Sequence, residues 1–168
     1  HVFHMFGVKD HKSIQALSEL ELAQMRGVHS LFSLTKQLVA HSNAARKLGI
    51  TVVAHNVHEV TGAESTLNPE YATLFGLAKV IQQEYPQLVS TCVDADEMVG
   101  VKELLLEATK EQTSKVVAYR RGKRYVEEFR RKALSASADC DVTVRENGVY
   151  LITGGTGGLG LAIAKYLA

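Results

Sequence analysis

Apolar residues along the chain alternate between short β-branched runs and longer stretches with a helical period. The runs at 2–6, 50–54 and 88–93 are typical of buried strands, because β-branched and aromatic side chains pack well on a pleated surface. Between the first two runs we expect a helix from about Glu21 to Lys47, closed by Gly49. One apolar face marks this helix, made of Val28, Leu31, Phe32, Thr35, Leu38 and Val39.

The same alternation continues after the second run. Asn68 can cap a helix that has Pro69 at its first position, and a further helix is expected over 97–111. Two strands, 115–119 and 124–129, are expected to flank a turn at 120–123. Strands that alternate with helices predict βαβ units, and therefore a mostly parallel, right-handed sheet flanked by helices.

Composition restricts the possible classes of protein. The 168 residues are 46% apolar and 22% charged, which is enough to bury a sizeable core. No stretch of 18 apolar residues and no signal-peptide pattern is present, so we expect a cytoplasmic protein without a membrane partner. Cys92 and Cys140 are far apart, which fits a reducing compartment.

The net charge of +1 predicts no nucleic-acid partner. A basic cluster near the predicted hairpin is interrupted by two glutamates, and no nucleic-acid-binding motif accompanies it, so we interpret it as a solvated face. Its members are Arg120, Arg121, Lys123, Arg124, Arg130, Arg131 and Lys132.

The most informative motif lies near the end of the sequence. Residues 148–152 predict a strand, an apolar helical start follows from 161, and five glycines fall within the seven positions 154–160. Such a turn lets a pyrophosphate approach bare backbone at a helix N-terminus, where free N–H groups bind anions. A tight turn that needs glycine only for steric reasons is the alternative.

Several of the loop residues have separate expected roles. Gly154 and Gly155 turn the backbone out of the strand. Gly158 leaves room for the pyrophosphate, and Gly160 lets the helix pack closely on the strand. The hydroxyls of the two threonines can hold the loop or reach phosphate oxygens. The expected cofactor-binding residues are Thr153, Gly154, Gly155, Thr156, Gly157, Gly158, Leu159 and Gly160.

The pattern Thr153-Gly154-x-x-x-Gly158-x-Gly160 resembles the short-chain dehydrogenase/reductase superfamily. Its form Thr-Gly-Gly-Thr-Gly-Gly-Leu-Gly is similar to the ketoreductase domains of modular polyketide synthases, and the stretches 71–86, 93–96 and 118–126 resemble the non-catalytic half of those reductases. The resemblance implies an α/β fold. We expect a truncated Rossmann-like parallel sheet flanked by helices, plus the first strand and helix of a second Rossmann unit.

The resemblance also implies a division of the chain. Residues 1–132 are expected to be the structural, non-catalytic subdomain. Residues 133–147 lose the apolar period and are expected to be a linker, although a surface loop within one domain is the alternative. Residues 148–168 are expected to be the first, incomplete βα unit of an NADPH-binding catalytic subdomain.

In this family NADPH reduces a β-ketoacyl thioester to the β-hydroxy form while the acyl group is bound to a carrier protein. The implied partners are the rest of the catalytic subdomain, an acyl carrier protein with its phosphopantetheine-bound substrate, and neighbouring synthase domains. Two roles stay open for this chain. It is either a piece of an active ketoreductase, inactive alone, or a non-catalytic remnant that acts as a scaffold.

The catalytic residues of the superfamily, a tyrosine with a lysine four positions later and a serine, are not expected in this chain. Tyr119 and Lys123 have the spacing but flank a predicted turn, whereas the chemistry needs one turn of helix. Tyr71 does lie on a predicted helix, but Phe75 occupies the lysine position, so we expect Tyr71 to pack.

Other polar candidates are also interpreted as structural. His55 and His58, with Glu59 beside them, lack the spacing of a zinc helix and a third ligand, so we expect no metal. Asp94 and Asp96 could act as paired carboxylates, but strand-end aspartates commonly form turns. The turns after Phe6 and Ala54 carry one glycine and none, so the first half should not bind a dinucleotide.

Overall fold

The computed structural model describes residues 1–8, 14–41, 47–110, 116–131 and 144–168. Two compact units divide the chain, His1–Phe129 and Arg130–Ala168, and each is described by itself. Cys140 and Lys132 lie outside the described residues.

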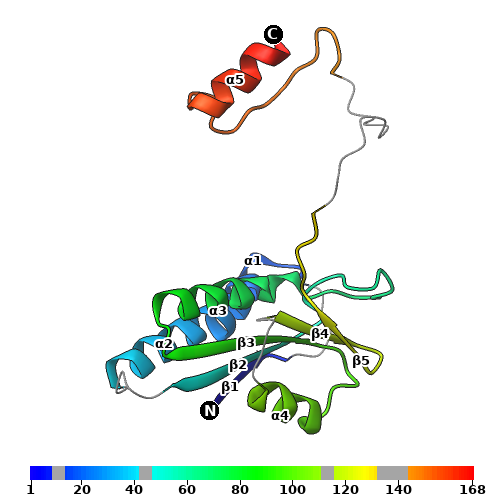
Figure 1. Cartoon of the computed structure of the whole chain (residues 1–168). Helices are drawn as coiled ribbons and strands as arrows, with labels where there is room; N and C mark the ends of the chain where they lie inside the picture. Colours follow the sequence, from blue (N-terminus) through cyan, green and yellow to red (C-terminus); the bar gives the residue numbers. More distant parts are fainter. Residues whose placement is uncertain (9–13, 42–46, 111–115, 132–143) are drawn as a thin grey trace. The chain divides into compact units, whose positions relative to one another are not determined.

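The first unit is built on a five-stranded sheet (Figure 1). The strands follow their order in the chain: β1 (Val2–Gly7), β2 (Leu48–His55), β3 (Leu88–Ala95), β4 (Val116–Arg120) and β5 (Lys123–Val126). The first three pairings are parallel and the β4–β5 pairing is antiparallel. The predicted α/β class with a mostly parallel sheet is therefore confirmed, as is the hairpin.

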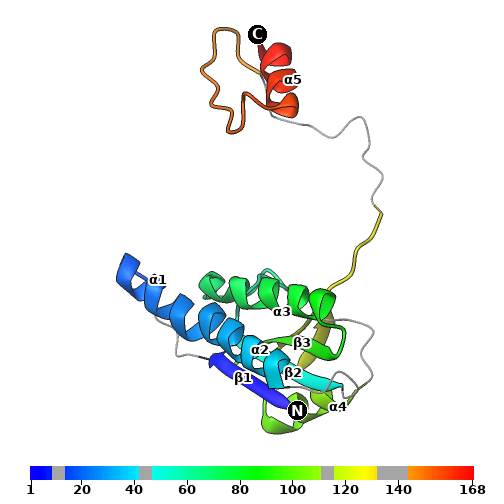
Figure 2. The same ribbon diagram turned by 90° about the vertical axis from the view of Figure 1, so that its left-hand side faces the viewer.

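Helices cover both faces of this sheet (Figures 1 and 2). One face carries α1 (Leu17–Gln24), a π-helical turn (Met25–His29), α2 (Ser30–His41), a 3₁₀ turn (Pro69–Tyr71) and α3 (Ala72–Glu84). The other face carries α4 (Val101–Thr109). Among the described residues, no helix is both long enough and apolar enough to span a bilayer.

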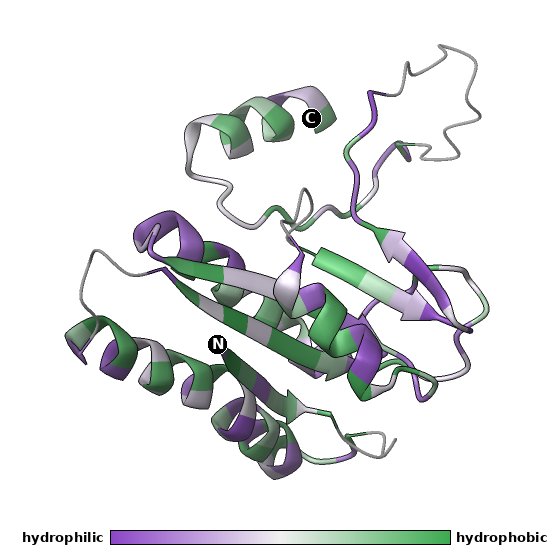
Figure 3. Cartoon of the chain, turned by 60° about the horizontal axis from the view of Figure 1, so that its bottom comes forward, coloured by the Kyte–Doolittle hydropathy of each residue, from purple (hydrophilic) through white to green (hydrophobic). Residues whose placement is uncertain are grey.

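Two apolar clusters form the core, one on each face of the sheet. The larger cluster joins α1, α2 and α3 to β2 and β3, and its fully buried members include Leu31, Ile50 and Leu74. The smaller cluster joins Leu104 of α4 to Val93 and Val117. The central strands are therefore apolar on both faces, as buried parallel strands are, and they are mostly green in Figure 3.

Several predicted boundaries are wrong. Gly49 lies inside β2 and does not close the preceding helix. Helix α4 begins at Val101 rather than Glu97, because Gly100 takes the N-cap position and donates its N–H to the Glu103 carboxylate, 3.0 Å away. Asn68 does precede the predicted helix, but its side-chain amide donates to the carbonyl oxygen of His55 at 2.9 Å.

The second unit contains helix α5 (Gly158–Leu167) after a turn at 153–156. The helix agrees with the sequence prediction, whereas the strand predicted at 148–152 is not formed. A strand forms only when its backbone pairs with a neighbouring strand, and the described part of this unit contains no strand with which residues 148–152 could pair. The β-branched run is therefore present without a sheet to join.

Candidate functional site

The glycine-rich loop turns the chain directly into helix α5. Gly154 has a φ of +71°, a conformation that side chains with a Cβ rarely adopt. Its carbonyl oxygen accepts the N–H of Gly157 at 2.9 Å, which closes a tight turn. Gly157 is then the N-cap of α5, and its carbonyl accepts the N–H of Leu161 at 2.9 Å. The sequence expectation that these glycines make a turn into a helix is confirmed.

Gly160 is required by close packing inside this loop. A Cβ at Gly160 would lie 2.3 Å from the carbonyl oxygen of Gly154 and 2.6 Å from the Cα of Gly155. Both atoms belong to the backbone and cannot move aside without opening the turn. The sequence predicted that Gly160 lets the helix pack closely on the preceding strand. That strand is not formed, and within the described residues the close contact is with the loop itself.

Gly158, unlike Gly160, has open space around it. Nothing lies within 4 Å of the position that its Cβ would occupy. Gly158, Leu159 and the two threonines Thr153 and Thr156 are exposed. The first N–H groups of an α-helix have no partner within the helix, and its N-terminus carries partial positive charge. The loop therefore has open space beside N–H groups that can bind an anion.

The tyrosines considered from the sequence are placed differently from catalytic ones. Tyr71 is 2% exposed, and burial, followed by the charge of Glu70, raises the pKa of its hydroxyl. Phe75 is equally buried in the same cluster. A proton donor needs access to substrate and a pKa near the working pH. The interpretation of Tyr71 as a packing residue is confirmed.

Tyr119 and Lys123 lie on β4 and β5, on either side of a two-residue turn. The Tyr119 hydroxyl donates to the Glu107 carboxylate of α4. Burial and that bond raise the pKa of Tyr119 to about 12. The match to a catalytic tyrosine–lysine pair is therefore accidental, as the sequence indicated.

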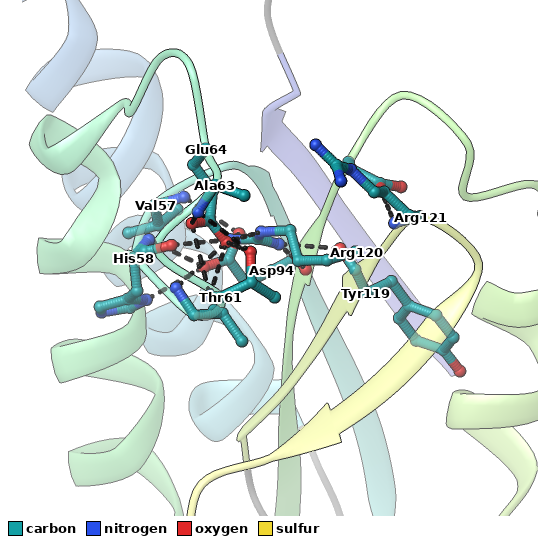
Figure 4. A network of polar contacts seen from close by, with 11 residues as sticks. Val57, His58, Thr61, Ala63, Glu64, Asp94, Tyr119, Arg120 and Arg121 are labelled. Carbon is teal, nitrogen blue, oxygen red and sulfur yellow. Dashed lines mark hydrogen bonds and ion pairs between the residues drawn. The ribbon is translucent and has the colours of Figure 1, made fainter.

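An extensive polar network in the first unit surrounds Arg120 (Figure 4). Its Nη2 lies 3.0 Å from Oδ1 of Asp94, and its Nε lies 3.1 Å from Oε1 of Glu64. Its guanidinium also donates to the carbonyl oxygens of Asp94 and His58, at 2.9 and 2.8 Å. The Arg120 side chain is only 5% exposed. The prediction that Arg120 belongs to a solvated basic face is wrong, although Arg121, Lys123, Arg124, Arg130 and Arg131 are exposed.

Asp94 holds the loop that follows β2. Its carboxylate accepts the backbone N–H groups of Val57 and His58, at 3.0 and 2.9 Å, and lies 3.1 Å from Nδ1 of His58. The turn-former interpretation is therefore wrong for Asp94. It is right for Asp96, which accepts the N–H of Met98 at 3.1 Å.

Glu64 completes this network from the same loop. Burial alone would raise its pKa, but hydrogen bonds from the backbone of Thr61 and Val60 and from the Thr61 hydroxyl lower the pKa to about 2. The carboxylate therefore stays ionised opposite Arg120. Neither Glu64 nor Arg120 carries a signal in the sequence, since 56 positions separate them. In this network Arg120 positions the loop and makes no contact that suggests catalysis.

The described part of the chain offers neither a metal-binding cluster nor a reactive thiol. It contains no group of three His, Cys, Asp or Glu side chains that could hold a metal ion. Cys92 is a free, buried thiol, and burial raises its pKa to about 12.

Comparison with known proteins adds an independent line of evidence. The chain is 35% identical over 104 residues to a component of the phenolphthiocerol/phthiocerol polyketide synthase of Mycobacterium tuberculosis, which covers 59% of the chain and 6% of that protein. It is 29% identical over 159 residues to polyketide synthase ThaG of Burkholderia thailandensis, which covers 93% of the chain and 3% of that protein. No protein-family model matches the chain.

A solved structure is similar over almost the whole chain. It is a multidomain structure of a keto acid-selecting NRPS module with adenylation, ketoreductase and pseudo Asub domains. The TM-score is 0.71 at 26% identity, and the match covers 98% of this chain and 14% of that one. The homologues are thus polyketide synthases, and the structural neighbour is a module that contains a ketoreductase. The chain spans at most about a tenth of the curated relatives.

Proposed function

We propose that this chain is part of a polyketide synthase ketoreductase, which reduces a carrier-bound β-ketoacyl thioester to the β-hydroxy form with NADPH. Residues 1–132 would be its structural subdomain, 133–147 the linker, and 148–168 the start of its catalytic subdomain. The observation that carries the proposal is the loop at 153–160, where Gly158 leaves open space at the N-terminus of α5. Similarity to polyketide synthases and to a ketoreductase-containing module supports the same assignment.

The residues present fit a dinucleotide. A diphosphate needs backbone N–H donors and a surface without a Cβ, and the exposed loop beside Gly158 offers both. Thr153 and Thr156 can add hydroxyl donors. When bound, NADPH supplies the hydride for carbonyl reduction. The contribution of this chain is to bind and orient the diphosphate.

Neither tyrosine considered from the sequence is placed to donate a proton to a substrate. Tyr71 is buried beside Phe75, and the Tyr119 hydroxyl is committed to Glu107. In a ketoreductase a tyrosine, a lysine and a serine of the catalytic subdomain would supply and stabilise the proton. We therefore expect the chain alone to be inactive.

The first test is the coding sequence beyond Ala168. A serine, followed by a tyrosine with its lysine, supports an active ketoreductase. A direct change into an unrelated domain, without these residues, supports the alternative of a non-catalytic scaffold inside the synthase. In that case no NADPH oxidation with a β-ketoacyl thioester is expected.

The second test concerns the loop in the protein that extends through the catalytic subdomain. Gly158→Ala adds a methyl group to open space, so folding should be unchanged while NADPH affinity falls about tenfold or more. Gly76→Ala is the matched control, because its Cβ also meets nothing within 4 Å and lies in the other unit. Fluorescence titration with NADPH measures the affinity of each of the two variants. Equal affinity in the two variants would show that Gly158 does not face the cofactor.

A further inference from the structure

A cavity of about 440 Å³ lies in the first unit, between helix α3 and strands β4 and β5. Its volume is within the range of small-molecule sites. Every lining residue falls between positions 58 and 127, so the cavity is distinct from the glycine-rich loop. An inference about it does not depend on the proposed function.

The walls of the cavity are mainly apolar. Phe75 and Gly76 of α3 form one side, and Val116 and Ala118 of β4 form the other. The sheet register pairs Ala118 with Tyr125, which also lines the cavity. The rings of His58 and Phe75 lie 5.5 Å apart between centroids, at 31°. Aromatic surface of this kind suits an apolar or cationic ligand.

The charges around the cavity cancel only in part. Lys79 Nζ contacts both carboxylate oxygens of Glu127, at 2.9 and 3.1 Å. Arg120 lies 3.0 Å from Asp94 but also pairs with Glu64, so its one positive charge is shared by two carboxylates. The second oxygen of Asp94 contacts His58 (Figure 4). Glu59 is exposed at the rim, and no comparable contact holds it among the described residues. Around the cavity the four carboxylates of Glu59, Glu64, Asp94 and Glu127 therefore outnumber the two side-chain cations, Lys79 and Arg120.

We propose that this cavity binds a small organic ammonium ion with an apolar body. The apolar part would lie over Phe75, Val116 and Ala118, and the ammonium group would face Glu59 at the rim. Aromatic rings add to the attraction, because their faces are electron-rich. An organic anion of the same size would form no ion pair with Lys79, because Lys79 is already paired with Glu127.

The experiment uses the full 168-residue chain and three probes of matched size. These are 2-phenylethylammonium, 2-phenylethanol and 3-phenylpropionate, titrated while the amide chemical shifts of Gly76 and Ala118 are followed by NMR. One partly solvated charge pair is worth up to about fivefold in affinity. We expect saturable shifts, with the ammonium ion binding about fivefold more tightly than the alcohol and the carboxylate binding most weakly.

Two variants test where the probe binds. Gly76→Leu should abolish the shifts, because its side chain extends into the cavity, whereas Gly76→Ala adds only one methyl group and should retain them. Both replace an exposed helical glycine, so the fold should be stabilised rather than harmed, which thermal unfolding checks.

A third variant tests the charge. Glu59→Gln should weaken the ammonium ion about fivefold and leave the alcohol unchanged. Glu21→Gln, at an exposed glutamate of α1, is the control and should change neither. The proposal is overturned if no probe gives saturable shifts, if the three probes bind equally, or if Gly76→Leu binds the ammonium ion like the unchanged protein.

Discussion

His4 is a buried histidine with an incomplete set of hydrogen bonds. It is 4% exposed, its Nε2 lies 2.8 Å from the Ser30 hydroxyl, and its Nδ1 has no partner within the described structure. Burial lowers the pKa of His4 below its ordinary value of 6.5, against a smaller opposing effect of its own backbone. Burial in the fold therefore disfavours the charged form of this imidazole.

This residue should make stability depend on pH. Because the folded pKa lies below 6.5, the unfolded chain binds the proton first as the pH falls. The free energy of unfolding is therefore unaffected by His4 well above pH 6.5 and falls as the pH drops through 6.5 toward the folded pKa. Urea unfolding at about pH 7.5 and about pH 5.5 measures the decrease.

His4→Leu should lessen this decrease, because the titrating group is gone. The control is His29→Leu at an exposed histidine, which should keep the pH dependence of the unchanged protein. A loss of stability between the two pH values that is the same in all three proteins would contradict the assignment to His4.

Single arginines join the elements of the first unit to one another. Arg124 on β5 makes a bidentate pair with Glu107 of α4, at 2.7 and 2.9 Å, and Glu107 also accepts the Tyr119 hydroxyl. Arg120 on β4 joins the end of β3 to the loop after β2. The two arginines of this one hairpin therefore contact different elements.

Replacing the buried Arg120 should lower the free energy of unfolding more than replacing the exposed Arg121. Arg120→Met leaves the carboxylates of Asp94 and Glu64, 1% and 4% exposed, without their cation. Removing one partner of a buried ion pair typically costs about 3–5 kcal/mol of unfolding free energy. Arg121→Met, at the exposed neighbour, should cost less than about 0.5 kcal/mol.

Urea unfolding of both variants at neutral pH provides the comparison. Since Arg121 donates to Asp96 through its backbone N–H, the methionine there keeps that bond. Equal stability of Arg120→Met and Arg121→Met would mean that the network around Arg120 does not stabilise the fold.

The first unit contains a complete core of its own. All five strands and both apolar clusters lie within His1–Phe129. A protein that ends at Phe129 should therefore fold alone, with a cooperative thermal transition and native-like near-UV circular dichroism. A broad transition, or loss of the near-UV signal, would show that residues 130–168 are needed to complete the core.

The second unit differs in this respect. Several apolar residues of α5 and its preceding segment are exposed, including Val149, Leu151, Leu159 and Tyr166. Ten helical residues alone do not bury such side chains, and helices of this length are marginal in water. We therefore do not expect residues 130–168 to fold in isolation.

Much of the fold could be predicted from local pattern. The β-branched runs at 50–54 and 88–93 identify β2 and β3, because such side chains pack on both faces of a buried sheet. The glycine spacing at 154–160 identifies the turn into α5, because the close backbone contacts that require glycine there are between residues near one another in sequence. The run at 149–152 has the same strand character, yet it forms no strand without a partner.

Residue chemistry and local spacing thus determined by themselves the α/β class, the glycine turn, and the placement of Tyr119 and Lys123 around a turn rather than on one helix. Tertiary structure alone decided that Arg120 is buried between Asp94 and Glu64, that His4 lacks a partner for Nδ1 within the described residues, and that a cavity opens beside α3. The reason is physical: propensity and periodicity act between residues close in sequence, whereas burial and ion pairing depend on groups that only the folded sheet brings together.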